Sequence, residues 1–156
     1  MGAALLPAMD RPVVPLPRMR RAAFRANLRR FLRTGGTGAE RTDPAPASPL
    51  VQAGCGVCRG HCCRLGQNHA FLDGSDFGGL AGADAYRWYV RMLPPESVEG
   101  SCVFHGPLGC VLPRERRAPI CNRYECDGLD QAAVSGARRL AAVDEDGRIL
   151  REVELR

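Results

Sequence analysis

The sequence contains no lysine, and each of its 22 basic residues is an arginine. We read this bias as a codon-usage signature of a GC-rich genome and not as a sign of function. The chain also lacks any apolar stretch near the ~18 residues that a membrane span requires. No basic segment precedes the short apolar run in its first ten residues, as it would in a secretory signal. These absences predict a soluble, cytoplasmic protein without a transmembrane segment.

The signatures of several enzyme classes are missing as well. No glycine-rich nucleotide loop occurs in a strand–helix setting, and no Ser/His/Asp set or pair of carboxylates stands out. The sequence therefore leaves open whether the chain is an enzyme.

Eight cysteines dominate the sequence. Four fall in residues 55–63, CGVCRGHCC, with the spacing C-x2-C-x3-C-C, and we call them the first cysteine block. The other four have the spacing C-x7-C-x10-C-x4-C and form the second cysteine block. Because the first block is too short to own a hydrophobic core, we interpret it as one wall of a metal site whose opposite wall is the second block. The predicted metal ligands are Cys55, Cys58, Cys62, Cys63, Cys102, Cys110, Cys121 and Cys126.

Three other interpretations of the cysteines are weaker. A disulfide framework needs an oxidising compartment, and the adjacent Cys62 and Cys63 would bond to each other only with strain. A thioredoxin-like redox pair at Cys55 and Cys58 would need a preceding hydrophobic strand and a βαβ pattern, and neither is present. Inert buried cysteines are not expected to cluster this tightly. Metal binding is the favoured interpretation.

The spacing leaves the identity of the metal open. Structural zinc takes four Cys or His ligands, but the second block lacks the paired C-x2-C knuckles of a zinc ribbon. The first block departs from the ferredoxin spacing C-x2-C-x2-C-x3-C-P and lacks its proline. Adjacent cysteines and long loop separations suit a compact multi-metal site, so we favour an iron–sulfur cluster or iron, with zinc as the alternative. His61 and His105 stand beside cysteines and are candidates for extra ligands, whereas His69 has no such neighbour.

Over about residues 52–128 the chain resembles the CxxCxxxCC family, also called the YkgJ-like cysteine cluster proteins. The resemblance rests on CGVCRGHCC, followed by CVFHGPLGC and then by RAPICNRYEC. The residues that match the family's second block are Cys102, Phe104, Gly109, Cys110, Val111, Cys121, Tyr124 and Cys126. The chain departs from the family pattern at His105, at Arg117-Ala118-Pro119, at Asn122 and at Glu125.

The family is described as a zinc- or iron-chelating domain and has no settled activity. What the resemblance implies is therefore metal chelation by the eight thiols. The same cluster motif occurs in flagellin lysine methylases, which resemble this chain over the cysteines only. This adds a redox or methyl-transfer-associated enzyme as an alternative function for the cluster.

The first fifty residues differ in charge from the rest. Residues 1–50 hold nine arginines and three acids, a net charge of 9 − 3 = +6, whereas residues 51–156 hold thirteen and fourteen, 13 − 14 = −1. We therefore expect residues 1–50 to form a flexible basic arm and residues 51–156 to form the cysteine-cluster domain.

Within this arm, prolines predict irregular structure over residues 1–16, and Gly, Pro, Ser and Thr predict a linker at 35–49. Between them a helix is expected at about residues 18–33, with arginines on its flanks. Its apolar stripe consists of Phe24, Leu28, Phe31 and Leu32. The helix either docks on the protein's own core or binds an anionic surface, a membrane or nucleic acid, in which case the chain is an adaptor. The arginine-rich start is also typical of an organellar transit peptide.

Regular structure is expected at two further places. A helix is predicted to end at Pro94-Pro95, and its apolar positions are Ala85, Trp88, Tyr89, Met92 and Leu93. A hairpin is predicted at residues 138–156 around Asp-Glu-Asp-Gly, with Ile149, Val153 and Leu155 on one strand face. The second cysteine block is too rich in Pro and Gly for regular structure. The predicted fold is a small, irregular α+β metal-binding domain of cysteine-rich loops, one or two helices and a C-terminal hairpin, preceded by the basic arm.

Overall fold

The computed structural model describes residues 3–8, 11–33, 48–60, 63, 82–117, 121 and 126–155. The helices of this part are α1 (Arg18–Arg33), α2 (Pro49–Cys58), α5 (Gly82–Arg91), the short 3-10 helix η1 (Arg114–Arg116) and α7 (Asp127–Ser135). The strands are β1 (Ala4–Pro7), β2 (Val13–Pro15), β3 (Glu96–Val98), β4 (His105–Gly106), β5 (Gly109–Cys110), β6 (Arg139–Val143) and β7 (Ile149–Glu154). The α+β class is thus confirmed and α1 matches the helix predicted in the arm, but the described residues after α1 contain three α-helices, α2, α5 and α7, in place of the one or two that the sequence predicts.

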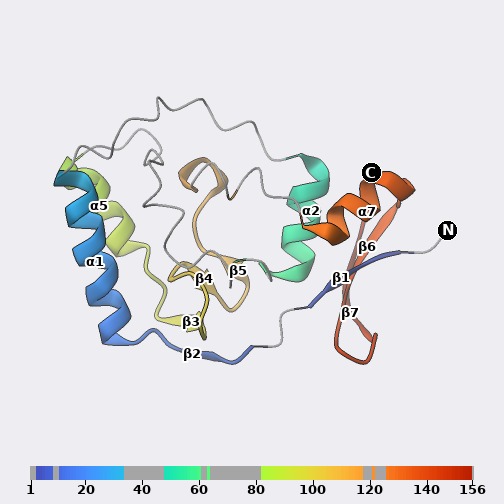
Figure 1. Ribbon diagram of the computed structural model, residues 1–156, viewed down its shortest axis with the longest axis horizontal. Helices are drawn as coiled ribbons and strands as arrows, with labels where there is room; N and C mark the ends of the chain where they lie inside the picture. Colours follow the sequence, from blue (N-terminus) through green and yellow to red (C-terminus); the bar gives the residue numbers. More distant parts are fainter. Residues whose placement is uncertain are drawn as a thin grey trace.

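The two larger hydrophobic cores of the described residues lie at opposite ends of the molecule (Figure 1), and a small third cluster consists of Ala8, Val57 and Ala142. Helices α1 and α5 enclose the first core, whose buried residues are Leu16, Phe24, Leu28, Phe31, Ala85, Tyr89, Leu93, Val103, Phe104 and Leu112. The sheet β1-β6-β7 and helices α2 and α7 enclose the second core, whose buried residues are Leu6, Val51, Cys58, Leu129, Ala132 and Leu140. Strands β2 to β5 lie between these two ends in Figure 1.

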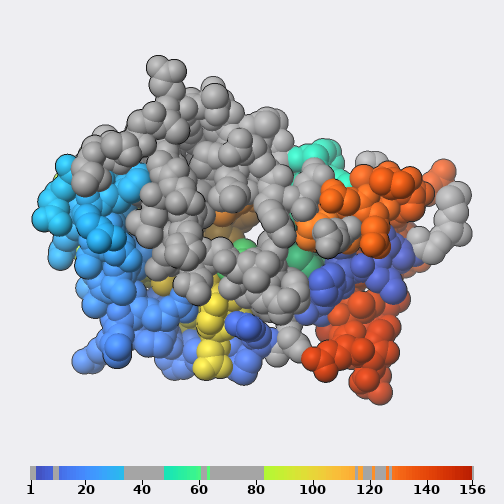
Figure 2. Space-filling model, in the orientation of Figure 1, coloured from blue at the N-terminus to red at the C-terminus, as the bar shows by residue number. Residues whose placement is uncertain are grey.

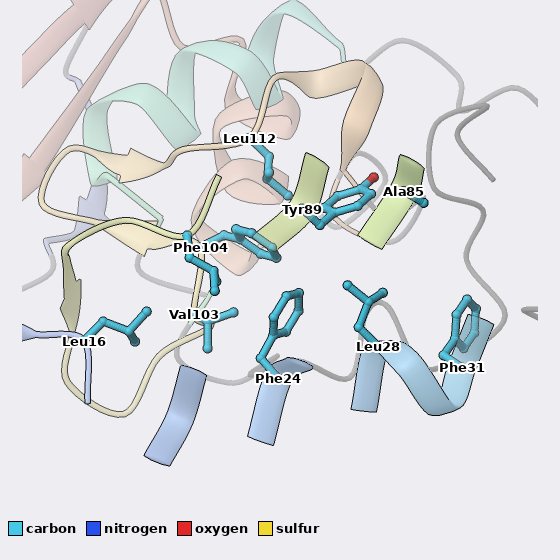
Figure 3. Close-up of a cluster of buried hydrophobic side chains, with 10 residues drawn as sticks. Leu16, Phe24, Leu28, Phe31, Ala85, Tyr89, Val103, Phe104 and Leu112 are labelled. Carbon is cyan, nitrogen blue, oxygen red and sulfur yellow. The ribbon is translucent and has the colours of Figure 1, made fainter. Parts of the chain in front are cut away.

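Aromatic rings organise the first core (Figure 3). Phe24 of α1 meets Phe104 edge-on, with ring centroids 5.2 Å apart, and Tyr89 of α5 meets Phe104 at 6.0 Å. The Tyr89 hydroxyl donates a hydrogen bond to the Arg116 carbonyl at 2.7 Å, so the ring is buried without leaving its polar end unsatisfied. The sequence allows the helix at residues 18–33 either to dock on the protein's own core or to bind an anionic surface. In the structure the apolar stripe of α1 docks on the first core.

The described residues before α1 are strands in part, where the sequence predicts irregular structure. β1 pairs in parallel with β6, and β2 pairs antiparallel with β3. Both are edge strands, and their prolines, Pro7 and Pro15, stand at strand ends, where a missing N–H costs no ladder hydrogen bond. The first strand therefore belongs to the sheet of the second core, and α1 belongs to the first core. These contacts argue against a free arm, and the predicted boundary near residue 50 stays a prediction.

The C-terminal hairpin β6–β7 is confirmed. One Asp144 carboxylate oxygen accepts hydrogen bonds from the amides of Asp146 and Arg148, both at 2.9 Å, and this fixes the turn. The register shifts by one residue beside Val143, which pairs with Ile149. This bulge moves Ile149 to the opposite face of the strand from Val153, and Ile149 is 56% exposed. The prediction that Ile149 shares a face with Val153 and Leu155 is therefore wrong for Ile149.

Two more segments have more structure than the sequence predicts. The second cysteine block contains a two-residue ladder, β4–β5, in which His105 pairs with Cys110. The first block begins inside helix α2 and not in a loop. Ser48 starts this helix, because its hydroxyl accepts a hydrogen bond from Val51 N at 3.2 Å and Pro49 fills the first turn. Among the described residues, no helix is both long and apolar enough to cross a membrane.

Candidate metal centre

Three of the predicted ligands gather at the second core. Cys55 and Cys58 stand three residues apart on α2, which places them on one face of the helix. Cys58 is a buried member of the core, and Cys55 and Cys126 pack against it. Cys126 begins α7, and its carbonyl accepts hydrogen bonds from Leu129 N and Asp130 N. The first and last cysteines of the sequence are thus brought to the same end of the molecule.

After Cys58 the chain turns sharply through two left-handed residues, Arg59 (φ 54°) and Gly60 (φ 78°). The turn closes with a hydrogen bond from Cys63 N to Gly60 O at 2.8 Å. A Cβ on Gly60 would lie 3.1 Å from both Cys63 Sγ and His105 Nε2. A thiol and an imidazole therefore lie over the bare backbone of Gly60, and a side chain there would crowd both groups as well as strain the backbone.

The contact of His105 bears on its predicted role as an extra ligand. Its ring is buried, and Nε2 lies 2.7 Å from the Arg59 carbonyl oxygen. Because a carbonyl only accepts hydrogen bonds, this contact fixes the proton on Nε2. In this arrangement Nε2 holds the backbone turn and is not available as a metal ligand.

Three other predicted ligands interact at the second block. The pKa of the Cys102 thiol is raised to about 12, chiefly by burial and in smaller part by the negative charges of Cys110 and Cys121, although the Phe104 amide and the Arg20 guanidinium act to lower it. Cys102 and Cys110 pack against the first core, and Cys121 is exposed. Without a cation, Cys102 therefore holds its proton at neutral pH.

The two cysteine blocks meet through backbone contacts. Cys102 N donates a hydrogen bond to Cys63 O at 3.3 Å. At Gly109, whose φ is 110°, a Cβ would lie 3.7 Å from the backbone of Arg59. The β4–β5 turn of the second block therefore lies against the end of α2, where the first block continues.

Arginines surround both groups of thiols. Arg20 donates to the Ser101 carbonyl beside Cys102. Arg151 donates from Nε to the Val57 carbonyl at 2.7 Å, next to Cys58. Burial and the charge of Arg59 lower the pKa of Arg151, and the nearby Cys58 raises it. Its Nη2 atom is buried and has no hydrogen-bond partner in the part of the chain that the structure describes. The Arg151 guanidinium therefore lies near Cys58, with one buried N–H group unpaired among the described residues.

Three arginines, Arg114, Arg116 and Arg117, lie between Cys110 and Cys121. Arg117 is half-buried and donates to the Leu112 carbonyl at 2.8 Å and to the Cys110 carbonyl at 3.5 Å. The Arg116 guanidinium lies over the Trp88 ring, 5.6 Å from its centroid. Arg117 is therefore a structural residue that holds the chain next to a predicted ligand, and not merely a solvated loop residue.

The described thiols do not complete a metal site by themselves. Within the described ranges, no group of three Cys, His, Asp or Glu side chains converges closely enough to hold a metal ion. No disulfide joins two of the seven cysteines that the structure describes. The remaining predicted ligand, Cys62, and the histidines His61 and His69 lie outside the described residues. Metal binding by the eight cysteines stays a prediction.

Sequence reasoning missed two residues of this region. Arg151 is far from the cysteines in the sequence, so no local pattern connects it with them. Gly60 could have been noticed, because a glycine between closely spaced cysteines is typical of a turn that needs a positive φ. Trp88 and Tyr89, two apolar positions of the helix predicted before Pro94-Pro95, belong to the first core: Tyr89 is buried within it and Trp88 packs against it.

Comparison with known proteins adds no relative. No family model, no curated protein and no solved structure matches the chain. The resemblance to the CxxCxxxCC family therefore rests on the cysteine spacing and the residues around it.

Proposed function

We propose that the chain is a metal-binding protein that holds iron or an iron–sulfur cluster, or alternatively zinc, through thiolates of both cysteine blocks. The observation that carries the proposal is the hydrogen bond from Cys102 N to Cys63 O, which sets the two blocks side by side. The blocks are far apart in the sequence, and the contact joins the residue that ends one block to the residue that begins the other.

The chemistry of the donors fits such a group. Thiolates are the preferred ligands of soft metal ions and of iron–sulfur clusters. Several thiolates together carry negative charge, and the cationic Arg20 and Arg151 lie close to Cys102 and Cys58. The buried Nη2 atom of Arg151 has no hydrogen-bond partner among the described residues, as expected of a donor that would pair with a thiolate sulfur. The described ligands alone do not complete a site, so the proposal requires Cys62 or rearranged thiols to complete it.

The placement of the thiols also suggests what the metal does for the protein. Cys55, Cys58 and Cys126 belong to the second core, whereas Cys102 and Cys110 pack against the first core. A metal centre that took ligands from both groups would cross-link the two cores. In small domains the formation of a metal site supplies folding free energy, so metal binding and stability should rise and fall together.

The test uses cysteine variants purified without oxygen. A C55S/C58S/C62S variant should lose most of its bound metal and should melt at a lower temperature than the wild type. The matched control, V134S, changes a side chain that is 91% exposed and should keep both properties. Full metal content in the triple variant would refute the proposed ligands.

A second candidate role is that of an adaptor that brings the cysteine cluster to an anionic partner. It is favoured by one observation: five arginines of α1 are exposed, and no acidic residue lies on that helix. This role adds to metal binding and does not replace it. It is tested by measuring partner binding and metal content in the same protein samples.

A further inference from the structure

The seven arginines of α1 fall into two groups with different surroundings. Arg20 and Arg21 are half-buried, and their side chains join α1 to the backbone of other segments. Arg20 donates to the Ser101 carbonyl, and Arg21 donates to the Pro94 carbonyl at 2.7 Å and to the Leu16 carbonyl at 3.4 Å. The second group is exposed, and we call it the α1 arginine face: Arg18, Arg25, Arg29, Arg30 and Arg33.

The arginines of the α1 arginine face make few contacts that stabilise the fold. Arg30 contacts Asn27 of the same helix at 3.4 Å, and the Arg29 guanidinium lies over the Tyr86 ring, 4.9 Å from its centroid. No carboxylate of the described residues forms an ion pair with these arginines. Five positive charges therefore lie on one helix without an ion pair to any carboxylate of the described residues, which favours an external anion as their partner.

The small residues of the helix leave this face accessible. Ala22, Ala23 and Ala26 are exposed and separate the arginines. Figure 2 shows α1, in blue to cyan, along one edge of the molecule with much of its length at the surface. At 1.5 Å per residue, the helix from Arg18 to Arg33 is about 22 Å long, which is enough to span several phosphates of a nucleic acid strand.

The packing of the helix argues against a membrane as the partner. A helix that lies in a membrane interface inserts its apolar face among the lipids. Here Phe24 and Leu28 are each only 2% exposed and Phe31 is 8% exposed, because they form part of the first core. Insertion would require the first core to open. The α1 arginine face can therefore interact with a lipid surface only through its charge.

The same burial argues against single-stranded nucleic acid. Proteins that bind single strands without sequence preference stack bases on exposed aromatic side chains. Both phenylalanines of α1 are buried, and Tyr86 on the adjacent helix is covered by Arg29. Guanidinium groups that have no exposed aromatic ring beside them are suited to contact the phosphate backbone of a duplex.

We propose that the α1 arginine face binds the phosphate backbone of a double-stranded nucleic acid without reading its sequence. The inference deepens the adaptor role proposed above by naming its partner. It does not depend on the metal centre, because the side-chain contacts of the five arginines within the described part of the chain are with Asn27 and Tyr86 and not with a cysteine.

The experiment titrates the full-length protein against a short labelled DNA duplex of arbitrary sequence and follows fluorescence anisotropy. The test variant is R25Q/R29Q/R33Q. The matched control is R138Q/R139Q/R148Q, which removes the same charge from exposed positions near the second core. Metal content and a melting curve are recorded for each variant, so a failure of the metal proposal is seen separately from a failure of this one.

The wild type is expected to bind the duplex, with affinity falling steeply between about 50 and 200 mM salt. The test variant should bind at least about tenfold more weakly, and its salt slope should fall by about 3 × 0.9 = 2.7, because three phosphate contacts are lost. The control should stay near the wild type. Equal binding by the test variant, an equal loss in the control, or binding to phosphatidylserine vesicles but not to the duplex would overturn the proposal.

Discussion

The two cores of this protein are built differently. The first core is aromatic and is centred on Phe104, which Phe24 and Tyr89 approach edge-on. The second core contains aliphatic residues and a cysteine, and α7 approaches both α2 and β1 closely at glycines. A Cβ on Gly54 would lie 2.3 Å from a methyl carbon of Leu129, and one on Gly128 would lie 2.5 Å from a methyl carbon of Leu6.

The cysteines are divided between these two environments. The first core buries four aromatic rings, whereas the second is smaller, includes Cys58 and packs against Cys55 and Cys126. We therefore expect the second core to depend more on a metal for its stability.

Removal of residues 1–50 should have the largest effect, because it takes a strand from the second core and a helix from the first. The remaining chain, residues 51–156, should fail to fold cooperatively and should bind little metal. Circular dichroism melting and metal analysis check this. A truncated chain that melts cooperatively with its metal bound would show that the first fifty residues are an arm added to an independent domain.

Phe104→Ala should destabilise the protein by about 3–5 kcal/mol, the usual loss when a buried aromatic ring is removed. Phe104 is 1% exposed and contacts the rings of both helices of the first core. Leu108→Ala, in the adjacent turn, is the control, since Leu108 is 78% exposed and its loss should stay within about 0.5 kcal/mol. Chemical denaturation measures both. Equal losses would mean that the ring cluster does not support the first core.

Two glycines of helix α2 probe the second core. Gly54→Ala should destabilise it by about 1–3 kcal/mol, because the new methyl group meets the buried Leu129. Gly56→Ala should stabilise the protein by up to about 1 kcal/mol, because nothing lies within 4 Å of the new methyl group and alanine is the better helix former. Both changes add one methyl group to the same helix. If urea titrations gave the same sign for both variants, the close approach of α2 and α7 at Gly54 would be disproved.

The Cys102 thiol gives a smaller, pH-dependent signal. Burial raises its pKa to about 12, so at neutral pH it is protonated in the metal-free protein. A metal ion that binds its sulfur must displace that proton, and metal affinity should weaken as the pH falls. Anaerobic titration with Zn²⁺ should release about one more proton per bound ion from the wild type than from Cys102→Ser. The same release from both proteins would remove Cys102 from the ligand set.

The parts of the fold that could be predicted are those with a local pattern. The stripe of Phe24, Leu28 and Phe31 marks α1, Pro94-Pro95 marks the end of the second predicted helix, and the acidic turn marks the C-terminal hairpin. All of these signals lie within one element or between neighbours in the sequence.

The parts that could not be predicted depend on distant contacts. β1 pairs with β6 at the other end of the chain, and its four residues carry no strand pattern that outweighs their proline. The bulge beside Val143, which turns Ile149 outward, is set by pairing with the neighbouring strand. At the candidate metal centre, spacing pointed to the cysteines, but the meeting of Cys63 with Cys102 and the approach of Arg151 required the folded chain.

The most direct test of the central claim is metal and sulfide analysis of the full-length protein purified without oxygen, together with its absorption spectrum. Bound iron with inorganic sulfide and thiolate-to-iron absorption, or bound zinc in a colourless protein, is the result we predict. A metal-free protein that folds with its cysteines joined in disulfides would contradict the claim.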